Sequence, residues 1–325
     1  MLDLRACDLA ERNVCRVVLP FGMPYAAVNG IRLHYRYLGR DRDPEEAPVL
    51  MLHGLGCSSE DWDLQVPAFS PHHRLIMPCL RGFGRSDKPS GCYTVPAFAQ
   101  DVLGLLDELQ VRRAHVLGHS MGGAVALQLA VERPERAASV TLVNAQASFE
   151  IERWREQLMK LYRIGMGSER GLQRMTKLLN RHCFPAPQQR ALREEMSRRH
   201  LRNHKPSYLA AIQALAGWSV VPRLRELQMP VLVVSGDQDF VPPEERIDMV
   251  RQLRNAHFEL VRDSRHATPY DQPRVFNDLV LSFLRDPQAL VGGPEDDDTA
   301  VGLLGGLRAR HSSSVARRGV AKANP

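Results

Sequence analysis

The stretch Gly118-His119-Ser120-Met121-Gly122-Gly123 decides how the rest of the chain is interpreted. It matches the pattern G-x-S-x-G and follows the short apolar run Ala114 to Leu117, which predicts a buried strand. A helix is expected after it, to about Val131, because Pro134 soon afterwards acts as a stop. In such a strand-to-helix turn the serine takes a strained backbone conformation and presents its hydroxyl at the carboxyl edge of a sheet. The free N–H groups at the start of the helix then lie beside that hydroxyl.

Strand and helix patterns alternate on both sides of this motif. Strands are expected at 26–38 (around the turn Asn29-Gly30), 48–52, 74–77, 114–117, 139–143, 230–235 and 257–262, and helices at 96–109, 118–131, 243–254 and 272–285. Between about 147 and 227 only helical patterning remains. This alternation predicts an α/β fold with a mostly parallel central sheet flanked by helices and interrupted by a helical cap insertion.

The same patterning divides the chain into four parts. They are a leader (1–24), an α/β core (25–146 and 228–285), a helical cap (147–227) and a tail (286–325) whose composition is typical of disorder.

Five motifs in this order resemble the α/β-hydrolase family, in its capped branch of esterases, thioesterases and related enzymes. They are His53-Gly54-Leu55-Gly56, Arg81-Gly82-Phe83-Gly84-Arg85-Ser86, the motif around Ser120, Gly236-Asp237-Gln238-Asp239 and Ser264-Arg265-His266. The resemblance covers roughly residues 26–285 and implies a triad in the chain order Ser…Asp/Glu…His. One departure is Cys79, where many relatives carry an aspartate two residues before the arginine; that position shapes a loop and is not part of the triad.

The resemblance assigns the chemistry to named residues. A serine hydroxyl is a poor nucleophile until a histidine accepts its proton and an acid orients that histidine. Ser120 is expected to be the nucleophile and His266, just after the strand at 257–262, its base. Asp237 and Asp239 both follow the strand at 231–235, and the family pattern G-x-x-D selects Asp239.

Two backbone N–H groups are expected to form the oxyanion hole. Met121 directly follows the nucleophile, and the resemblance points to Leu55 for the second donor. His53 is interpreted as a structural part of that loop, while nearby Cys57 raises the hypothesis of thiol sensitivity. No metal or cofactor is required, and none of the six cysteines has the spacing of a zinc site.

We therefore expect a serine hydrolase that forms an acyl-enzyme, with a carboxylic ester carrying an apolar acyl chain as the favoured substrate. Trp154, Phe184 and Trp218 are candidates to line the acyl pocket. Acyl-CoA thioesters, lipids, lactones and β-diketone carbon–carbon bonds stay open as alternatives within the same family. An alternative of another class is a small-molecule receptor built on the hydrolase fold.

The distribution of charge in the sequence limits which partners and which location are expected for the chain. The chain carries a net charge of +6, and residues 151–205 hold 14 Lys/Arg against 5 Asp/Glu. This basic segment leaves two interpretations open, a solvated helix face or peripheral contact with an anionic membrane. We expect no nucleic-acid partner, because no reader motif is present, and the sequence leaves the oligomeric state open. Charged residues interrupt the N-terminal region, so a signal peptide is not expected, and a cytoplasmic location is predicted.

Overall fold

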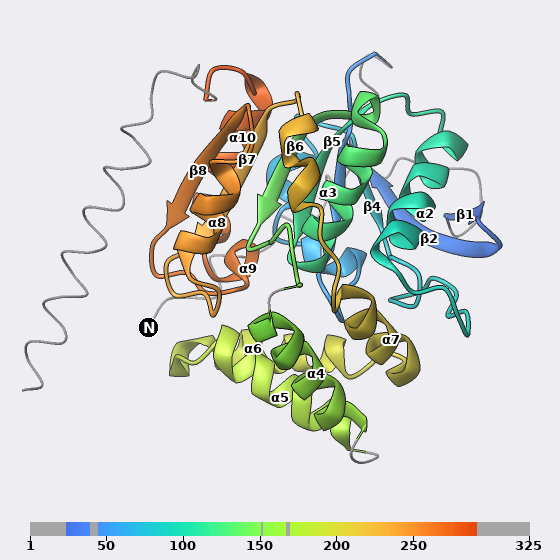
Figure 1. Cartoon of the computed structure of the whole chain (residues 1–325), viewed down its shortest axis with the longest axis vertical. Coiled ribbons are helices and arrows are strands. Elements are labelled where there is room, and N and C mark those ends of the chain that lie inside the picture. The colour runs from blue at the N-terminus through green and yellow to red at the C-terminus, as the bar shows by residue number, and fades with distance from the viewer. Residues whose placement is uncertain (1–23, 40–44, 151, 167–169, 291–325) are drawn as a thin grey trace, which may run out of the picture.

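The computed structural model describes residues 24–39, 45–150, 152–166 and 170–290 (Figure 1). The predicted leader up to residue 23 and the predicted tail beyond residue 290 lie outside the described residues. None of the helices in the described ranges has the length and apolar character needed to cross a bilayer.

The described residues form a mostly parallel eight-stranded sheet with the strand order β1-β2-β4-β3-β5-β6-β7-β8. Its strands are β1 (Tyr25–Val28), β2 (Ile31–Leu38), β3 (Val49–Leu52), β4 (Leu75–Pro78), β5 (Ala114–His119), β6 (Ala137–Val143), β7 (Val231–Gly236) and β8 (Ala256–Val261). The pairs β1–β2 and β2–β4 are antiparallel and the other pairs are parallel. This sheet confirms the predicted fold class.

Helices cover both faces of the sheet. They are α1 (Val66–Phe69), α2 (Val95–Glu108), α3 (Met121–Glu132), α8 (Pro243–Val250), α9 (Thr268–Asp271) and α10 (Pro273–Arg285), with short 3-10 helices η2 (Ser59–Trp62), η3 (Pro134–Arg136) and η5 (Val221–Glu226). A further 3-10 helix, η4 (Pro187–Gln189), lies in the segment between β6 and β7. Strand β3 shows how the core divides, because Leu50 and Leu52 join the cluster under α2 and α3 while Val49 and Met51 join the cluster under α10. A strand buried on both faces is continuously apolar, which is why β3, β4 and β7 were visible in the sequence as unbroken hydrophobic runs.

Between β6 and β7 the chain forms a helical layer of α4 (Glu152–Met166), α5 (Gly171–Cys183), α6 (Arg190–His200) and α7 (Lys205–Leu215). Figure 1 shows these green and yellow helices together beneath one edge of the sheet. The loops that follow β3, β5, β7 and β8 lie at the same edge, because residues from those loops and from all four helices line one cavity. This arrangement places the sequence motifs between the sheet and the helical layer.

Candidate active site

Ser120 lies at the sharp turn between β5 and α3. Its backbone has φ 53° and ψ −117°, a conformation that L-residues rarely adopt and that costs on the order of 1–3 kcal/mol. The Ser120 N–H donates to the Val143 carbonyl at 2.9 Å, which ties the turn to the neighbouring strand. A Cβ at Gly122 would overlap the Leu52 carbonyl, so glycine is needed for the close approach of α3 to the sheet. The strain predicted at this serine is therefore present in the structure.

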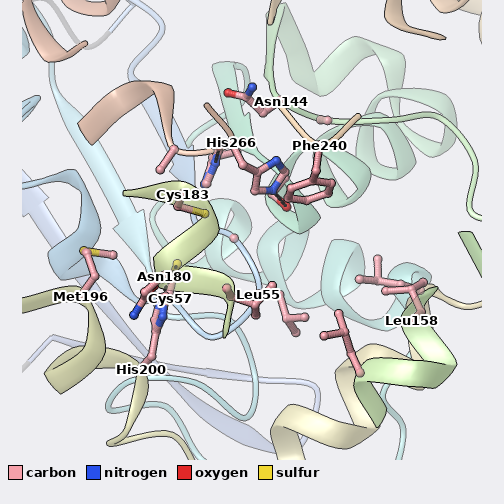
Figure 2. A pocket seen from close by; sticks show the side chains of 18 of the residues that line it. Leu55, Cys57, Asn144, Leu158, Asn180, Cys183, Met196, His200, Phe240 and His266 are labelled. Atoms are coloured by element: carbon pink, nitrogen blue, oxygen red, sulfur yellow. Dashed lines mark hydrogen bonds between the residues drawn. The ribbon is translucent and has the colours of Figure 1, made fainter. Parts of the chain in front are cut away.

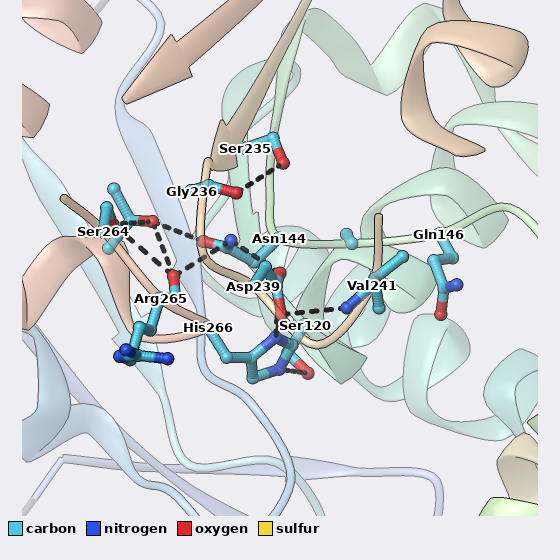
Figure 3. Close-up of polar contacts among 12 residues, drawn as sticks. Ser120, Asn144, Gln146, Ser235, Gly236, Asp239, Val241, Ser264, Arg265 and His266 are labelled. Atoms are coloured by element: carbon cyan, nitrogen blue, oxygen red, sulfur yellow. Dashed lines mark hydrogen bonds and ion pairs between the residues drawn. The ribbon is translucent and has the colours of Figure 1, made fainter. Parts of the chain in front are cut away.

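His266 follows β8 and reaches Ser120 from the adjacent loop. Its Nε2 lies 2.9 Å from the Ser120 Oγ (Figure 3). The His119 Nε2 lies 2.8 Å from the His266 carbonyl oxygen and holds that backbone in place. Burial, together with the neighbouring His266, lowers the pKa of His119 to about 4, so the His119 ring is neutral and donates this bond at neutral pH. The Phe240 ring packs against the His266 imidazole with centroids 4.2 Å apart.

Asp239 completes the chain of contacts. Its two carboxylate oxygens lie 3.0 and 3.2 Å from the His266 Nδ1. The Asn144 Nδ2 donates to the Asp239 Oδ2 at 2.8 Å, and the Arg246 guanidinium donates to the same oxygen at 2.6 Å. Burial alone would raise the pKa of Asp239, but the charges of His266 and Arg246, with hydrogen bonds from His266 and Asn144, hold it below its ordinary value. Asp239 is therefore ionised wherever the protein is folded at neutral pH.

The competing carboxylate, Asp237, has a different partner. Its Oδ1 accepts the backbone N–H of Ser264 at 3.1 Å. Of the two carboxylates after β7, it is Asp239 whose oxygens contact His266.

The two residues predicted to donate to the oxyanion are Met121 and Leu55. Met121 is the first residue of α3, and Leu55 follows Gly54 in the loop after β3, where it lines the same cavity as Ser120. Neither N–H has a hydrogen-bond partner among the described residues. Both N–H groups are therefore unpaired within the described part of the chain, and their part in an oxyanion hole stays a prediction.

His53 contributes to this loop without facing the reacting atoms. Its Nε2 accepts the Leu80 N–H at 2.9 Å, and its Nδ1 lies 2.8 Å from the Gly54 carbonyl. Its ring supports the loop that carries Leu55.

A cavity of about 150 Å³ lies over Ser120 and His266, between the sheet edge and the helical layer (Figure 2). Apolar side chains supply much of its described lining: Leu55, Phe149, Leu158, Leu161, Leu179, Phe184, Met196, Leu215 and Phe240. An apolar cavity of this size binds small apolar molecules.

Of the three predicted pocket residues, Phe184 lines the cavity and is buried. Trp218 lies elsewhere: its Nε1 donates to the Gln128 Oε1 of α3 at 2.7 Å, and it is absent from the described lining. The indole N–H explains this placement, because a buried tryptophan needs a partner for that group and Gln128 provides it. Trp154 belongs to α4, but its side chain lies outside the described residues.

Three contributors to the site were missed by sequence reasoning. Asn144 belongs to none of the motifs quoted above, and Arg246 lies in a helix whose sequence shows no site motif. Arg246 is fully buried, with further hydrogen bonds to Ser235 and to the Val241 and Ala145 carbonyls. Phe240 follows Asp239 directly. Its position beside the acid was the one available signal, since loop residues at the carboxyl edge of a sheet contribute to sites.

The arrangement can support acyl transfer. The Ser120 hydroxyl is within hydrogen-bonding distance of a histidine, and that histidine is oriented by a buried carboxylate. Both the serine and the histidine line the same cavity.

Comparisons with known proteins agree with this description of the fold. A family model described as alpha/beta hydrolase fold matches residues 47–273. The protein of Rhizobium rhizogenes named "Putative carbamate hydrolase RutD" is 30% identical over 261 residues, which cover 78% of this chain and 98% of that relative. The 2-hydroxy-6-oxo-6-phenylhexa-2,4-dienoate hydrolase of Burkholderia cepacia is 28% identical, covering 79% of this chain and 92% of the relative. The crystal structure of the enol-lactonase from Burkholderia xenovorans LB400 superposes with a TM-score of 0.74 at 29% identity, covering 81% of this chain and all of that one. The similarity therefore spans nearly the whole of each relative, and all three carry the names of hydrolytic enzymes.

Proposed function

The chain belongs to the α/β-hydrolase fold family, and from this premise we propose that it is a serine hydrolase that cleaves a carboxylic ester with an apolar acyl chain. The observation that carries the proposal is the continuous contact from Ser120 through His266 to Asp239 at the floor of a largely apolar cavity.

In the proposed reaction the Ser120 Oγ attacks the ester carbonyl while the His266 Nε2 takes its proton. The carbonyl π electrons move to oxygen, and the N–H groups of Leu55 and Met121 bind the resulting oxyanion. Removing one such donor typically costs about 10²–10³ in rate. His266 then returns the proton to the leaving alcohol as the tetrahedral intermediate collapses to an acyl-enzyme.

A water molecule deprotonated by the same histidine releases the acid. Asp239 holds the proton of His266 on Nδ1 and stabilises the imidazolium that forms in both steps. The reaction uses these side chains and water.

The proposal also specifies which type of bond is cleaved, an ester bond. Lactones, thioesters and β-diketone carbon–carbon bonds all present a carbonyl to the same nucleophile, and the names of the relatives include an enol-lactonase and a hydrolase of a dienoate. The ester is favoured because the cavity is largely apolar and because no Lys, Arg, Asp or Glu belongs to its described lining.

The test is hydrolysis of p-nitrophenyl esters from acetyl to palmitoyl by the wild type and by Ser120→Ala, repeated with acyl-CoA thioesters, lactones and a β-diketone. Activity that peaks at one acyl length and is lost in Ser120→Ala supports the proposal. Activity that survives in Ser120→Ala contradicts the assignment of the nucleophile. A stoichiometric burst without steady turnover would instead identify a receptor that reacts once with its ligand.

A second candidate function, hydrolysis of lipid esters at an anionic membrane, is favoured by the outer surface of α4 and α5. Six exposed cations on this surface form no salt bridge with a described residue: Lys160, Arg163, Arg170, Arg174, Lys177 and Arg181. The side chains of Met166 and Leu178 are each 54% exposed beside them. Cations close to an anionic bilayer contribute about 1 kcal/mol each.

Cosedimentation with phosphatidylglycerol–phosphatidylcholine vesicles tests this candidate. The triple variant Arg174→Glu, Lys177→Glu and Arg181→Glu should reduce binding at low salt. A control with a smaller change of charge is Arg198→Glu on α6, where the arginine is already paired with Glu195. If the wild type is not retained by anionic vesicles at low salt, membrane contact through this surface is wrong.

A further inference from the structure

One part of the cavity is polar but uncharged. Cys57, Asn180, His200 and Tyr208 all line it, and we call this group the polar lobe. Figure 2 shows Cys57, Asn180 and His200 gathered on one side of His266, whereas Leu158 lies on the other side. Nothing in the proposed acyl transfer uses the polar lobe.

Asn180 presents a hydrogen-bond acceptor to the cavity. Its side chain is almost fully buried, and its Nδ2 donates to the Ser197 Oγ at 2.9 Å. Ser197 in turn donates to the Arg193 carbonyl at 2.7 Å, which fixes the orientation of the Asn180 amide. The Asn180 Oδ1 has no hydrogen-bond partner among the described residues. It is also not one of the two unpaired side-chain atoms that are sealed from solvent in that part of the chain, which are Trp62 Nε1 and Gln65 Oε1. The open surface of this oxygen therefore faces the cavity.

Tyr208 presents a donor by the same reasoning. Its side chain is 4% exposed, and its hydroxyl has no hydrogen-bond partner among the described residues. The enclosed unpaired polar atoms are Trp62 Nε1 and Gln65 Oε1, so the Tyr208 oxygen keeps open surface, and the cavity is the space that the residue lines. Burial raises the pKa of Tyr208, which keeps the proton on the hydroxyl.

The two remaining members of the polar lobe are also neutral. The Cys57 Sγ lies 3.5 Å from the His200 Nε2. Burial raises the pKa of the Cys57 thiol and lowers the pKa of His200, so the pair is a thiol and an imidazole, not a thiolate and an imidazolium. The polar lobe thus offers donors and acceptors without a formal charge.

We propose that the polar lobe is a subsite for an uncharged hydrogen-bonding group of the substrate, a hydroxyl or a carbonyl, separate from the carbonyl that Ser120 attacks. The inference rests on the proposed function for the position of the reacting carbonyl. A hydroxyl can accept from the Tyr208 donor and donate to the Asn180 acceptor, whereas a carbonyl can accept from Tyr208 alone. A carboxylate would be buried against no cation of the described lining, at a cost that an uncharged group avoids.

The test compares esters in matched pairs, with and without a terminal hydroxyl. In one series the hydroxyl ends the acyl arm of p-nitrophenyl esters of four to ten carbons. In the other it ends the alcohol arm of hexanoate esters, whose hydrolysis is followed by acid release. The measured quantity is the ratio of kcat/KM for the hydroxylated ester to kcat/KM for its plain partner. The wild type is expected to show a ratio above one at some length in one series.

Tyr208→Phe keeps the ring and removes the donor, so that ratio is expected to fall about 10-fold. The matched control is Tyr93→Phe, because the Tyr93 hydroxyl is bonded to Ser207 at 2.8 Å and does not line the cavity. The control should leave the ratio as in the wild type. A wild-type ratio of one or less at every length in both series would overturn the proposal, and so would equal ratios in wild type and Tyr208→Phe.

Binding separates failure of this inference from failure of the proposed function. Kd values of the intact esters are measured by calorimetry on Ser120→Ala, with and without Tyr208→Phe. Tighter binding of hydroxylated esters that depends on Tyr208 supports the polar lobe even if no ester is turned over by the wild type. Ser120-dependent hydrolysis with no effect of the hydroxyl would leave the serine hydrolase standing and remove the subsite.

Discussion

Replacing Asp239 by asparagine separates its role in the reaction from its role in the fold. The asparagine amide is nearly isosteric, but its Nδ2 can donate to the His266 Nδ1. The histidine then carries its proton on Nε2, facing the Ser120 Oγ at 2.9 Å, and it can no longer accept the serine proton. A wrong tautomer of this kind costs about 10⁴ in kcat in a serine hydrolase with the same three side chains. We expect a loss of that order in kcat on the best p-nitrophenyl ester.

The same substitution leaves Arg246 as an unpaired buried cation. Both side chains of the Asp239–Arg246 pair are fully buried, and breaking such a pair costs about 3–5 kcal/mol. The double variant Asp239→Asn with Arg246→Met removes the unpaired charge and should recover part of the stability measured by chemical unfolding. It should recover none of the activity, because the tautomer of His266 is still wrong.

Asp237→Asn is the matched control, since its carboxylate accepts a backbone N–H from Ser264 and does not contact His266. It should retain activity within a few fold of the wild type. The reasoning is refuted if Asp239→Asn keeps more than a tenth of the wild-type kcat in a folded protein. It is refuted equally if the double variant regains activity together with stability.

Two further predictions follow from the elbow and its neighbouring histidine. Gly122→Ala places a Cβ against the Leu52 carbonyl and should destabilise the protein by about 1–3 kcal/mol or more. In the control Gly91→Ala the added Cβ meets nothing within 4 Å, so the thermal midpoint should stay unchanged. Equal midpoints for the two variants would contradict the packing argument. The pKa of His119 is lowered from 6.5 to about 4, so the stability that it contributes is fully present above pH 6.5 and is lost as the pH falls toward 4. This contribution is on the order of 3 kcal/mol. The variant His119→Gln can still donate to the His266 carbonyl, and it should make the free energy of unfolding depend less on pH between 6.5 and 4. An unchanged pH profile would count against a buried neutral His119.

The sequence predicted those elements whose residue pattern can arise from only one kind of structure. The strands β3 and β7 are apolar along their whole length because helices cover both faces of the sheet. The turn at Ser120 was visible because glycine is needed where α3 approaches β3. The assignment of Asp239 depends on the resemblance, since two carboxylates follow β7 and spacing alone does not choose between them. His266 was proposed from its place after the strand at 257–262 together with the resemblance.

The residues that escaped prediction act through tertiary contacts. Arg246 resembles any arginine of an exposed helix until the fold buries it against Asp239. Phe184 and Trp218 are both aromatic residues of one helical stretch, and only packing decides that the first lines the cavity while the indole N–H of the second is bonded to Gln128. Helical periodicity says which face of a helix is apolar, but it does not say which neighbour that face meets.

This contrast also explains why the reaction is easier to infer than the substrate. The groups proposed to react stand in loops after β5, β7 and β8, and a parallel sheet brings the ends of its strands to one edge whatever the loops contain. The polar lobe instead depends mainly on α5, α6 and α7, which carry Asn180, His200 and Tyr208, while Cys57 comes from the loop after β3. The helical side chains reach the cavity through the packing of the helices in this layer. A substitution such as Tyr208→Phe alters what the cavity accepts without touching the contacts from Ser120 to Asp239. Substrate preference can therefore change in the helical layer while the chemistry at the sheet edge stays the same.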